Sequence, residues 1–280
     1  MTWLKHDELR VFIQPQAIAL SRFKGVRGFK PQLVRHEVIQ LSEIASSPDD
    51  YAVLIKRLQT LLKDDKWQAV AAKVMLSSHF MRYAVIPWNS EISSADERQA
   101  YLNHHFVLAL GDAVKSWDMR MDAPKYRQSA LASAMPSSLQ LALVDVFAQA
   151  NMRLRAVHPY LMQAANQALE ALETEESGWL AVVENQRLCV ALMVDSTWRM
   201  VRNLSLETDI ATQIETLIKR EQMLSSAEMQ PNLPLIVHWP HAAAVQAIDI
   251  AGHRVWSLVS SEPAETHQTN RLGSLDWAMR

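Results

Sequence analysis

Short runs of alternating apolar and polar residues open both halves of the chain and predict β-strands. Within each half, three such runs follow one another with only short turns between them, as in an antiparallel meander. The runs are 9–13, 17–23 and 32–41 in the first half, and 179–183, 187–194 and 198–206 in the second. Two three-stranded meanders are therefore predicted, each beginning one half of the molecule.

Apolar residues at helical spacing predict helices after each meander. Ser47 and Pro48 suit the N-cap and first position of a helix that ends near 64–65, and Gly111 suits the end of a helix over 97–110. The other predicted helices are 139–149, 161–172, 209–224 and 242–248, and the other strands are 69–76, 80–86, 119–121, 129–135, 153–157, 233–239 and 255–259. Both halves thus share the order meander, helix, strand, with a later strand and helix. This order predicts an α/β protein with an internal structural repeat, joined at the acidic segment 173–178.

Composition narrows the classes of function. The formal net charge of the 280 residues is −2, which argues against a nucleic-acid binder. The single cysteine, Cys189, lies in an apolar run and is expected to be buried, so no disulfide framework is predicted. The start of the chain has no signal-peptide pattern, and no segment approaches the about 18 apolar residues that span a bilayer. We expect a cytoplasmic protein.

The duplicated order resembles the actin-like ATPase superfamily. Within it, segments 74–88 and 151–160 are similar to parts of PilM of type IV pilus assembly, the cytoplasmic part of the type II secretion protein GspL, and the pilus protein MshI. The resemblance implies a duplicated actin-like (ribonuclease H-like) fold with mixed sheets. The first domain would span 1–174, with an inserted subdomain at about 70–135, and the second would span 175–280.

The resemblance also implies a partner. PilM-like proteins lie beneath the inner membrane and bind the short cytoplasmic tail of a bitopic inner-membrane protein of a pilus or secretion machine. Apolar and aromatic residues cluster at Phe80, Arg82, Tyr83 and Trp88. We expect the tail to dock there, in a groove of the first half, while the recurring tryptophans at strand ends mostly anchor the core. A homodimer is left open.

The resemblance places two phosphate loops at Gln14 and Gln16 and at Asn185 and Gln186. Neither turn contains glycine, and none of the six glycines of the chain lies in a glycine-rich loop. Phosphate binding needs backbone amides at close approach, which bulky side chains and Pro15 obstruct. The sequence therefore predicts degenerate loops, no required cofactor and a scaffold without catalysis. An ATPase that uses unconventional loops with Mg-ATP is the alternative.

Other chemical interpretations are weaker. Glu184 could stand near a metal, although a hairpin residue is the simpler interpretation. His104 and His105 point about 100° apart on a helix and cannot share one metal. Ser77, Ser78 and His79 suit a strand end better than a nucleophile and base, since no Gly-x-Ser-x-Gly elbow is present. A sugar-kinase relative would need a catalytic aspartate, and Asp195 lies in a hairpin turn, the usual place for Asp. The segment 238–241 falls where an actin-like fold meets adenine, but it is interpreted as a loop.

Overall fold

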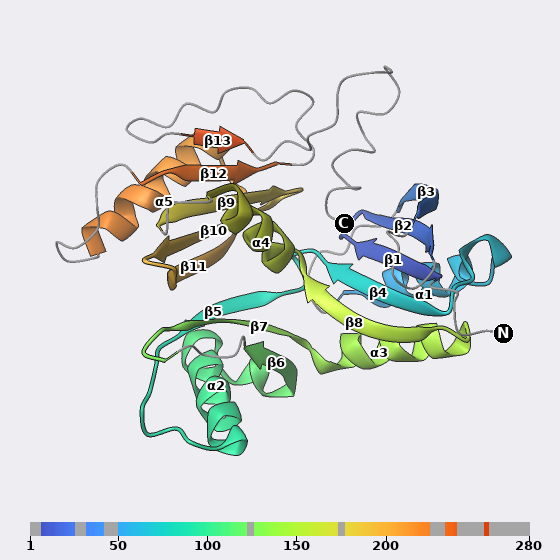
Figure 1. Ribbon diagram of the computed structural model, residues 1–280, viewed down its shortest axis with the longest axis horizontal. Helices are drawn as coiled ribbons and strands as arrows, with labels where there is room; N and C mark the ends of the chain where they lie inside the picture. Colours follow the sequence, from blue (N-terminus) through green and yellow to red (C-terminus); the bar gives the residue numbers. More distant parts are fainter. Residues whose placement is uncertain are drawn as a thin grey trace.

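The computed structural model describes residues 7–25, 32–41, 50–121, 126–172, 177–224, 233–239 and 255–257. Two five-stranded sheets dominate these residues, and a smaller three-stranded sheet lies beside them. Figure 1 shows the first sheet in blue and cyan with β8 in yellow-green, the second sheet in yellow to orange, and the small sheet in teal and green. The two large sheets have the same strand order, so the structure is duplicated, as predicted.

The first sheet has the order β3-β2-β1-β4-β8. Strands β1, β2 and β3 are antiparallel neighbours, whereas β4 runs parallel to β1 and β8 runs parallel to β4. The alternation of the first meander is thus a three-stranded ladder, and the later strands add to its other side. The strands are β1 (Glu8–Ile13), β2 (Ala17–Lys24), β3 (Gln32–Gln40), β4 (Ala71–Leu76) and β8 (Arg153–Pro159).

The second sheet repeats this plan with the order β11-β10-β9-β12-β13. Its first three strands are antiparallel, and β12 and β13 join in parallel. All seven residues of β9 are buried, as expected for the central strand of a sheet that is covered on both faces. The strands are β9 (Gly178–Glu184), β10 (Arg187–Val194), β11 (Thr197–Ser205), β12 (Leu235–His238) and β13 (Val255–Ser257).

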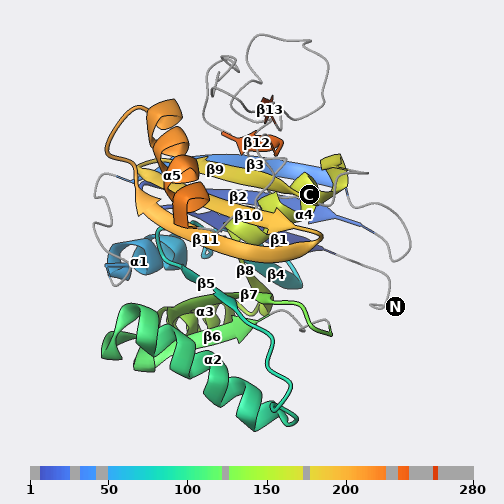
Figure 2. The ribbon, with the colours of Figure 1, turned by 90° about the vertical axis from the view of Figure 1, so that its left-hand side faces the viewer.

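Helices cover the sheets in layers. Helices α1 (Ala52–Leu61) and α3 (Ser137–Gln149) pack their leucines against one face of the first sheet. Helix α4 (Tyr160–Leu172) packs on its other face, in a core that also contains residues of the second sheet. Helix α5 (Ile210–Leu224) covers the outer face of the second sheet, as Figure 2 shows. The core around α4 therefore joins the two halves.

The small sheet is inserted between β4 and α3. Its order is β5-β7-β6, with β5 (Arg82–Ile86), β6 (Trp117–Met121) and β7 (Ala130–Pro136) antiparallel. Helix α2 (Ala95–Leu110) packs against one face of it. Short 3₁₀ turns, Asp65–Trp67 and Asp112–Ser116, complete the described helical segments.

Local signals account for the ends of α2. Ser94 and Glu97 form a reciprocal capping box, in which Glu97 N donates to Ser94 Oγ at 3.1 Å and Ser94 N donates to Glu97 Oε2 at 2.9 Å. Gly111 ends the helix with φ of 79°, a conformation that favours glycine. The predicted helix end at Gly111 is therefore confirmed.

Some predictions fall on residues that are not described. These are the cap at Ser47 and Pro48, the helix at 242–248 and most of the junction at 173–178. In the described chain α1 follows Tyr51, whose side chain makes no capping hydrogen bond. Among the described helices, none combines the length and apolarity required to cross a membrane.

Candidate binding groove and domain interface

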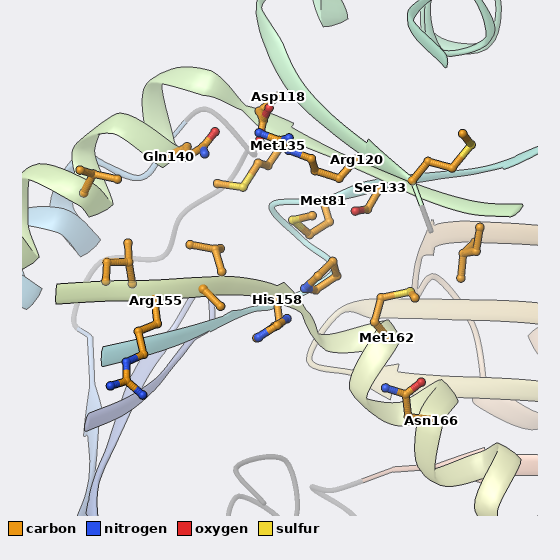
Figure 3. Close-up of a pocket in the computed structure, with 17 residues that line it drawn as sticks. Met81, Asp118, Arg120, Ser133, Met135, Gln140, Arg155, His158, Met162 and Asn166 are labelled. Atoms are coloured by element: carbon orange, nitrogen blue, oxygen red, sulfur yellow. Dashed lines mark hydrogen bonds and ion pairs between the residues drawn. The ribbon is translucent and has the colours of Figure 1, made fainter. Parts of the chain in front are cut away.

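A cavity of about 580 Å³ lies between β8 and the inserted sheet. Its walls come from the inserted sheet, from α3, and from β8 and the start of α4. Figure 3 shows Asp118, Arg120, Ser133, Met135 and Gln140 on one side, and Arg155, His158, Met162 and Asn166 on the other. We call this cavity the groove.

The inserted sheet presents one of its two faces to the groove. Leu131, Ser133 and Met135 alternate along β7 and line the groove, whereas Ala132 and Ala134 face α2. Opposite them, β8 is the last strand of its sheet among the described residues. An edge strand keeps one row of backbone N–H and C=O groups that β4 does not use. The groove thus combines apolar side chains with unpaired strand backbone.

The side chains of the groove are a mixture of apolar and polar groups. Four of them are methionines, Met81, Met121, Met135 and Met162, whose flexible thioethers fit ligands of different shape. Among the charged residues, Arg120 Nε pairs with Asp118 Oδ2 at 3.2 Å. The groove therefore has no large excess of one charge.

The four residues predicted to bind a partner lie beside the groove and do not line it. Phe80 is 0% exposed and belongs to the core of the first half, so it is not accessible to a peptide. Arg82 Nη1 donates to Met81 O at 2.8 Å, and the Tyr83 hydroxyl lies 3.3 Å from Ser78 Oγ. Trp88 packs edge-on against Tyr126, with ring centroids 5.5 Å apart.

The sequence analysis selected the aromatic residues of one segment of the first half. It did not select Met162, Ser133 or the strand that forms the opposite wall of the groove. The available signal was the alternation of residues 131, 133 and 135 together with the position of β8 at the end of its sheet. The first part is visible in the sequence, whereas the second requires the strand order. Contact of Arg82, Tyr83 and Trp88 with a partner stays a prediction.

The two predicted phosphate turns lie against each other between the halves. The β1–β2 turn is closed by Gln14 N donating to Ala17 O at 2.9 Å. In the β9–β10 turn, Gln186 adopts φ of 61°, the left-handed region that glycine favours. The Asn185 amide Nδ2 donates to Gln16 Oε1, across the gap between the halves. Two side-chain amides therefore connect the turns that the resemblance assigns to phosphate.

A buried carboxyl group makes a second connection. Glu184, at the end of β9, is 4% exposed, and its Oε1 accepts a hydrogen bond from Ser78 N at 2.9 Å. Burial raises the pKa of the Glu184 carboxyl, and hydrogen bonds from Ser77 and Ser78 offset this only in part. The Glu184 side chain thus accepts a hydrogen bond from a backbone amide in the turn after β4.

Asn203 of β11 holds the same turn. Its Nδ2 donates to Ser78 O at 2.7 Å and to Met81 O at 3.1 Å. Beneath these polar contacts, Phe12 stacks on Tyr160 with centroids 4.8 Å apart, and the Tyr160 hydroxyl hydrogen-bonds His238 Nε2. The domain interface is therefore packed and hydrogen-bonded by the chain's own groups.

Polar groups of the two turns and of Glu184 bond other groups of the chain. A phosphate site needs amides free to approach the anion and a carboxylate or its water shell near the metal. Here Glu184 engages Ser78, and the amides of Gln16 and Asn185 engage each other. Within the described ranges no cluster of three His, Cys, Asp or Glu side chains could hold a metal ion.

The structure also shows where the residues weighed as weaker candidates for catalysis lie. Ser77, Ser78 and His79 form the turn after β4, in which His79 N donates to Ser77 Oγ at 3.1 Å. Asp195 lies in the β10–β11 turn with φ of 50°. Burial raises the pKa of the Cys189 thiol well above its ordinary value, so this buried cysteine is not a reactive thiolate.

Comparison with solved structures decides the fold. The chain superimposes on the PilM-PilN type IV pilus biogenesis complex with a TM-score of 0.66, at 11% identity and with 97% of each chain covered. This chain has the actin-like ATPase fold. It is also similar to the cytoplasmic domain of EpsL, an inner-membrane component of the Vibrio cholerae type II secretion system (TM-score 0.52, 11% identity, 82% and 81% covered). A Bacteroides thetaiotaomicron protein with an actin-like ATPase fold and unknown function gives a TM-score of 0.55 at 9% identity, with 85% and 84% covered.

These likenesses concern architecture, since all three identities are near 10%. No protein-family model and no curated protein matches the chain. The actin-like fold predicted from the duplicated meander order is confirmed.

Proposed function

We propose that this actin-like protein is a scaffold without catalytic activity. It acts in a type IV pilus or type II secretion-like assembly, at the cytoplasmic side of the inner membrane. There it binds the cytoplasmic tail of a bitopic inner-membrane protein as an extended segment in the groove. The observation that carries the proposal is the groove itself, in which a face of the inserted sheet with both apolar and polar side chains lies opposite the edge strand β8.

The mixed apolar and polar lining of the groove favours an extended amphipathic peptide. A segment laid along β8 would hydrogen-bond its edge, while alternate side chains would enter the methionine-lined side. The fold of the PilM-PilN complex and of the EpsL cytoplasmic domain supports the assembly context. The interface contacts at Glu184 and at Gln16 support a role that needs no ATP or Mg²⁺.

Calorimetric titration with a tail peptide tests the proposal. The probes are synthetic peptides of the cytoplasmic tails of the bitopic membrane proteins encoded beside this chain's gene. Ser133→Trp fills the groove from the centre of β7, and Ser138→Trp is the matched control on the exposed side of α3. We expect a tail to bind the wild type and the control alike, and the Ser133 variant at least about tenfold more weakly, a loss of about 1.4 kcal/mol.

Two results would contradict the proposal. Binding that Ser133→Trp leaves unchanged would move the site out of the groove. The absence of binding by every such tail would reject the partner class. The Trp88→Ala variant, measured in the same titration, tests whether the predicted aromatic segment contributes at all.

A further inference from the structure

Strand β3 forms the edge of the first sheet farthest from the groove. The sheet runs from β3 to β8, and in the described residues β3 pairs only with β2. Figure 1 shows β3 at the outer border of the blue sheet. Three apolar side chains of this edge are unusually open, with Leu33 44%, Val34 52% and Val38 37% exposed. An apolar edge strand of this length is a template for pairing with another strand.

The sequence of β3 is complementary to itself when it is reversed about His36. Arg35 then lies opposite Glu37, and Val34 lies opposite Val38. The outer positions match as well, with Leu33 opposite Ile39 and Gln32 opposite Gln40. Antiparallel pairing of two copies would therefore set apolar beside apolar, amide beside amide and positive beside negative on either side of His36.

The backbone of β3 has the orientation that such pairing needs. Leu41 N donates to Gln16 O at 2.8 Å, which marks residue 41 as turned toward β2. Because these directions alternate along an antiparallel strand, His36, Val38 and Gln40 turn their N–H and C=O groups to the side away from β2. Two copies of His36 would then exchange backbone hydrogen bonds at the centre.

Charged side chains of β3 and of Lys66 form a row of ion pairs along this edge. Arg35 Nη1 lies 2.9 Å from Glu37 Oε1, and Lys66 Nζ lies 3.0 Å from Glu37 Oε2. A second copy in antiparallel register brings its own Glu37 beside Arg35 and its own Arg35 beside Glu37. Both copies then form alternating charge rows instead of like-charge contacts.

We propose that β3 is a self-recognition edge through which two copies of this chain form an isologous dimer, antiparallel about His36. The two five-stranded sheets become one continuous sheet, and the two-fold axis passes between the His36 residues. The register shift of β3 against β2 next to Phe23 places an extra residue near Val34. Pairing is therefore most regular from Arg35 to Val38. The grooves remain open, because β8 is the opposite edge of each sheet.

Charge reversal tests the register directly. Arg35→Glu places glutamates on both sides of each cross-strand pair, and Glu37→Arg places cationic groups there. We expect the wild type to be a dimer by sedimentation at micromolar to sub-millimolar concentration, and each variant alone to be a monomer. An equimolar mixture of the two variants should recover the dimer, since the introduced glutamate of one chain then faces the introduced arginine of the other. Arg199→Glu, at an exposed position of β11, is the control and should remain dimeric.

Val38→Pro gives a second route that leaves the charges intact. It removes an N–H directed to the free edge and leaves the hydrogen bonds to β2, so the folded chain should lose only its dimer. Circular dichroism melts establish that each variant is folded. A wild type that stays monomeric over the whole range overturns the proposal. So does a dimer that both single variants retain, or a mixture that does not reassociate.

Discussion

Two surfaces of the first half meet at the turn between β4 and β5, and they differ in whether the second half of the chain contacts them. On one side, Glu184 and Asn203 of the second half hydrogen-bond Ser78, and an apolar core closes beneath them. On the other side, Met81 lines a groove along β8, which pairs on only one side among the described residues. The two turns that the resemblance assigns to phosphate are joined by a hydrogen bond between their own side chains, while the groove on the other side is a cavity of about 580 Å³. Binding is therefore expected at the groove.

The largest effect should come from the apolar core that joins the halves. Phe12 is fully buried, stacks on Tyr160 and lies in a cluster that includes Leu180 and Val182 of the second half. We expect Phe12→Ala to lower the free energy of unfolding by about 3–5 kcal/mol, because the cavity cannot be refilled. Urea unfolding followed by circular dichroism measures this loss.

Phe106→Ala is the matched control, since Phe106 is equally buried but lies in the core of the inserted sheet and α2. We expect a similar loss with both halves still packed together. In the Phe12 variant, by contrast, the interface pair Gln16–Asn185 should lose its coupling. A loss below about 1 kcal/mol for Phe12→Ala would show that the interface is not a true core.

The second effect is the pH dependence that Glu184 imposes. Burial raises its pKa in the folded chain above the unfolded value, so folding favours the protonated carboxyl. The stability that this proton contributes is fully present below the unfolded pKa and is lost as pH rises through the raised folded pKa. Each unit of pKa shift corresponds to about 1.4 kcal/mol.

Glu184→Gln isolates this term, because glutamine still accepts from Ser78 N but does not titrate. We expect the variant to gain stability relative to the wild type as pH rises from about 4 toward neutrality, in denaturant unfolding series. Glu207→Gln, on an exposed loop, provides the baseline. A difference between Glu184→Gln and wild type that stays constant over this range would mean that the pKa of Glu184 is the same in the folded and the unfolded chain.

The comparison of the two surfaces also shows what could be predicted from sequence. Alternation within 9–41 and 179–206 was enough for both meanders, because half-buried strands repeat every two residues. The absence of glycine at Gln14–Gln16 and at Asn185–Gln186 is visible in the sequence itself. Their hydrogen bond joins residues 169 positions apart, and no local pattern encodes such a contact.

The groove and the Glu184 contact were harder for the same reason. Glu184 reads as a hairpin residue in the sequence, yet the packing of the second half on the first buries it against Ser78. The groove depends on β8 ending the sheet and on the insert turning one face of β7 toward it. Sheet order and the packing of the halves depend on contacts between residues far apart in the sequence, so local residue patterns do not predict them.

The smallest effect tests whether the phosphate turns are held by their own side chains. Gln16 and Asn185 are partly or fully exposed, so we expect each alanine substitution to cost at most about 0.5–1.5 kcal/mol. A double-mutant cycle should give a positive coupling between them. The Gln59–Gln149 pair, an exposed amide bond between α1 and α3 of the same half, provides a cycle of equal chemistry that does not cross the interface.

The same variants decide between the scaffold and the ATPase alternative. If the amide pair and Glu184 replace a nucleotide, wild type and variants should show no heat of Mg-ATP binding and no rise in melting temperature, because a ligand bound only to the folded state must stabilise it. Saturable binding by the wild type would revive the ATPase. Binding only by the Asn185→Ala and Glu184→Gln variants would mean that these side chains block a site that the fold still retains, which would make the closed interface a device that excludes nucleotide.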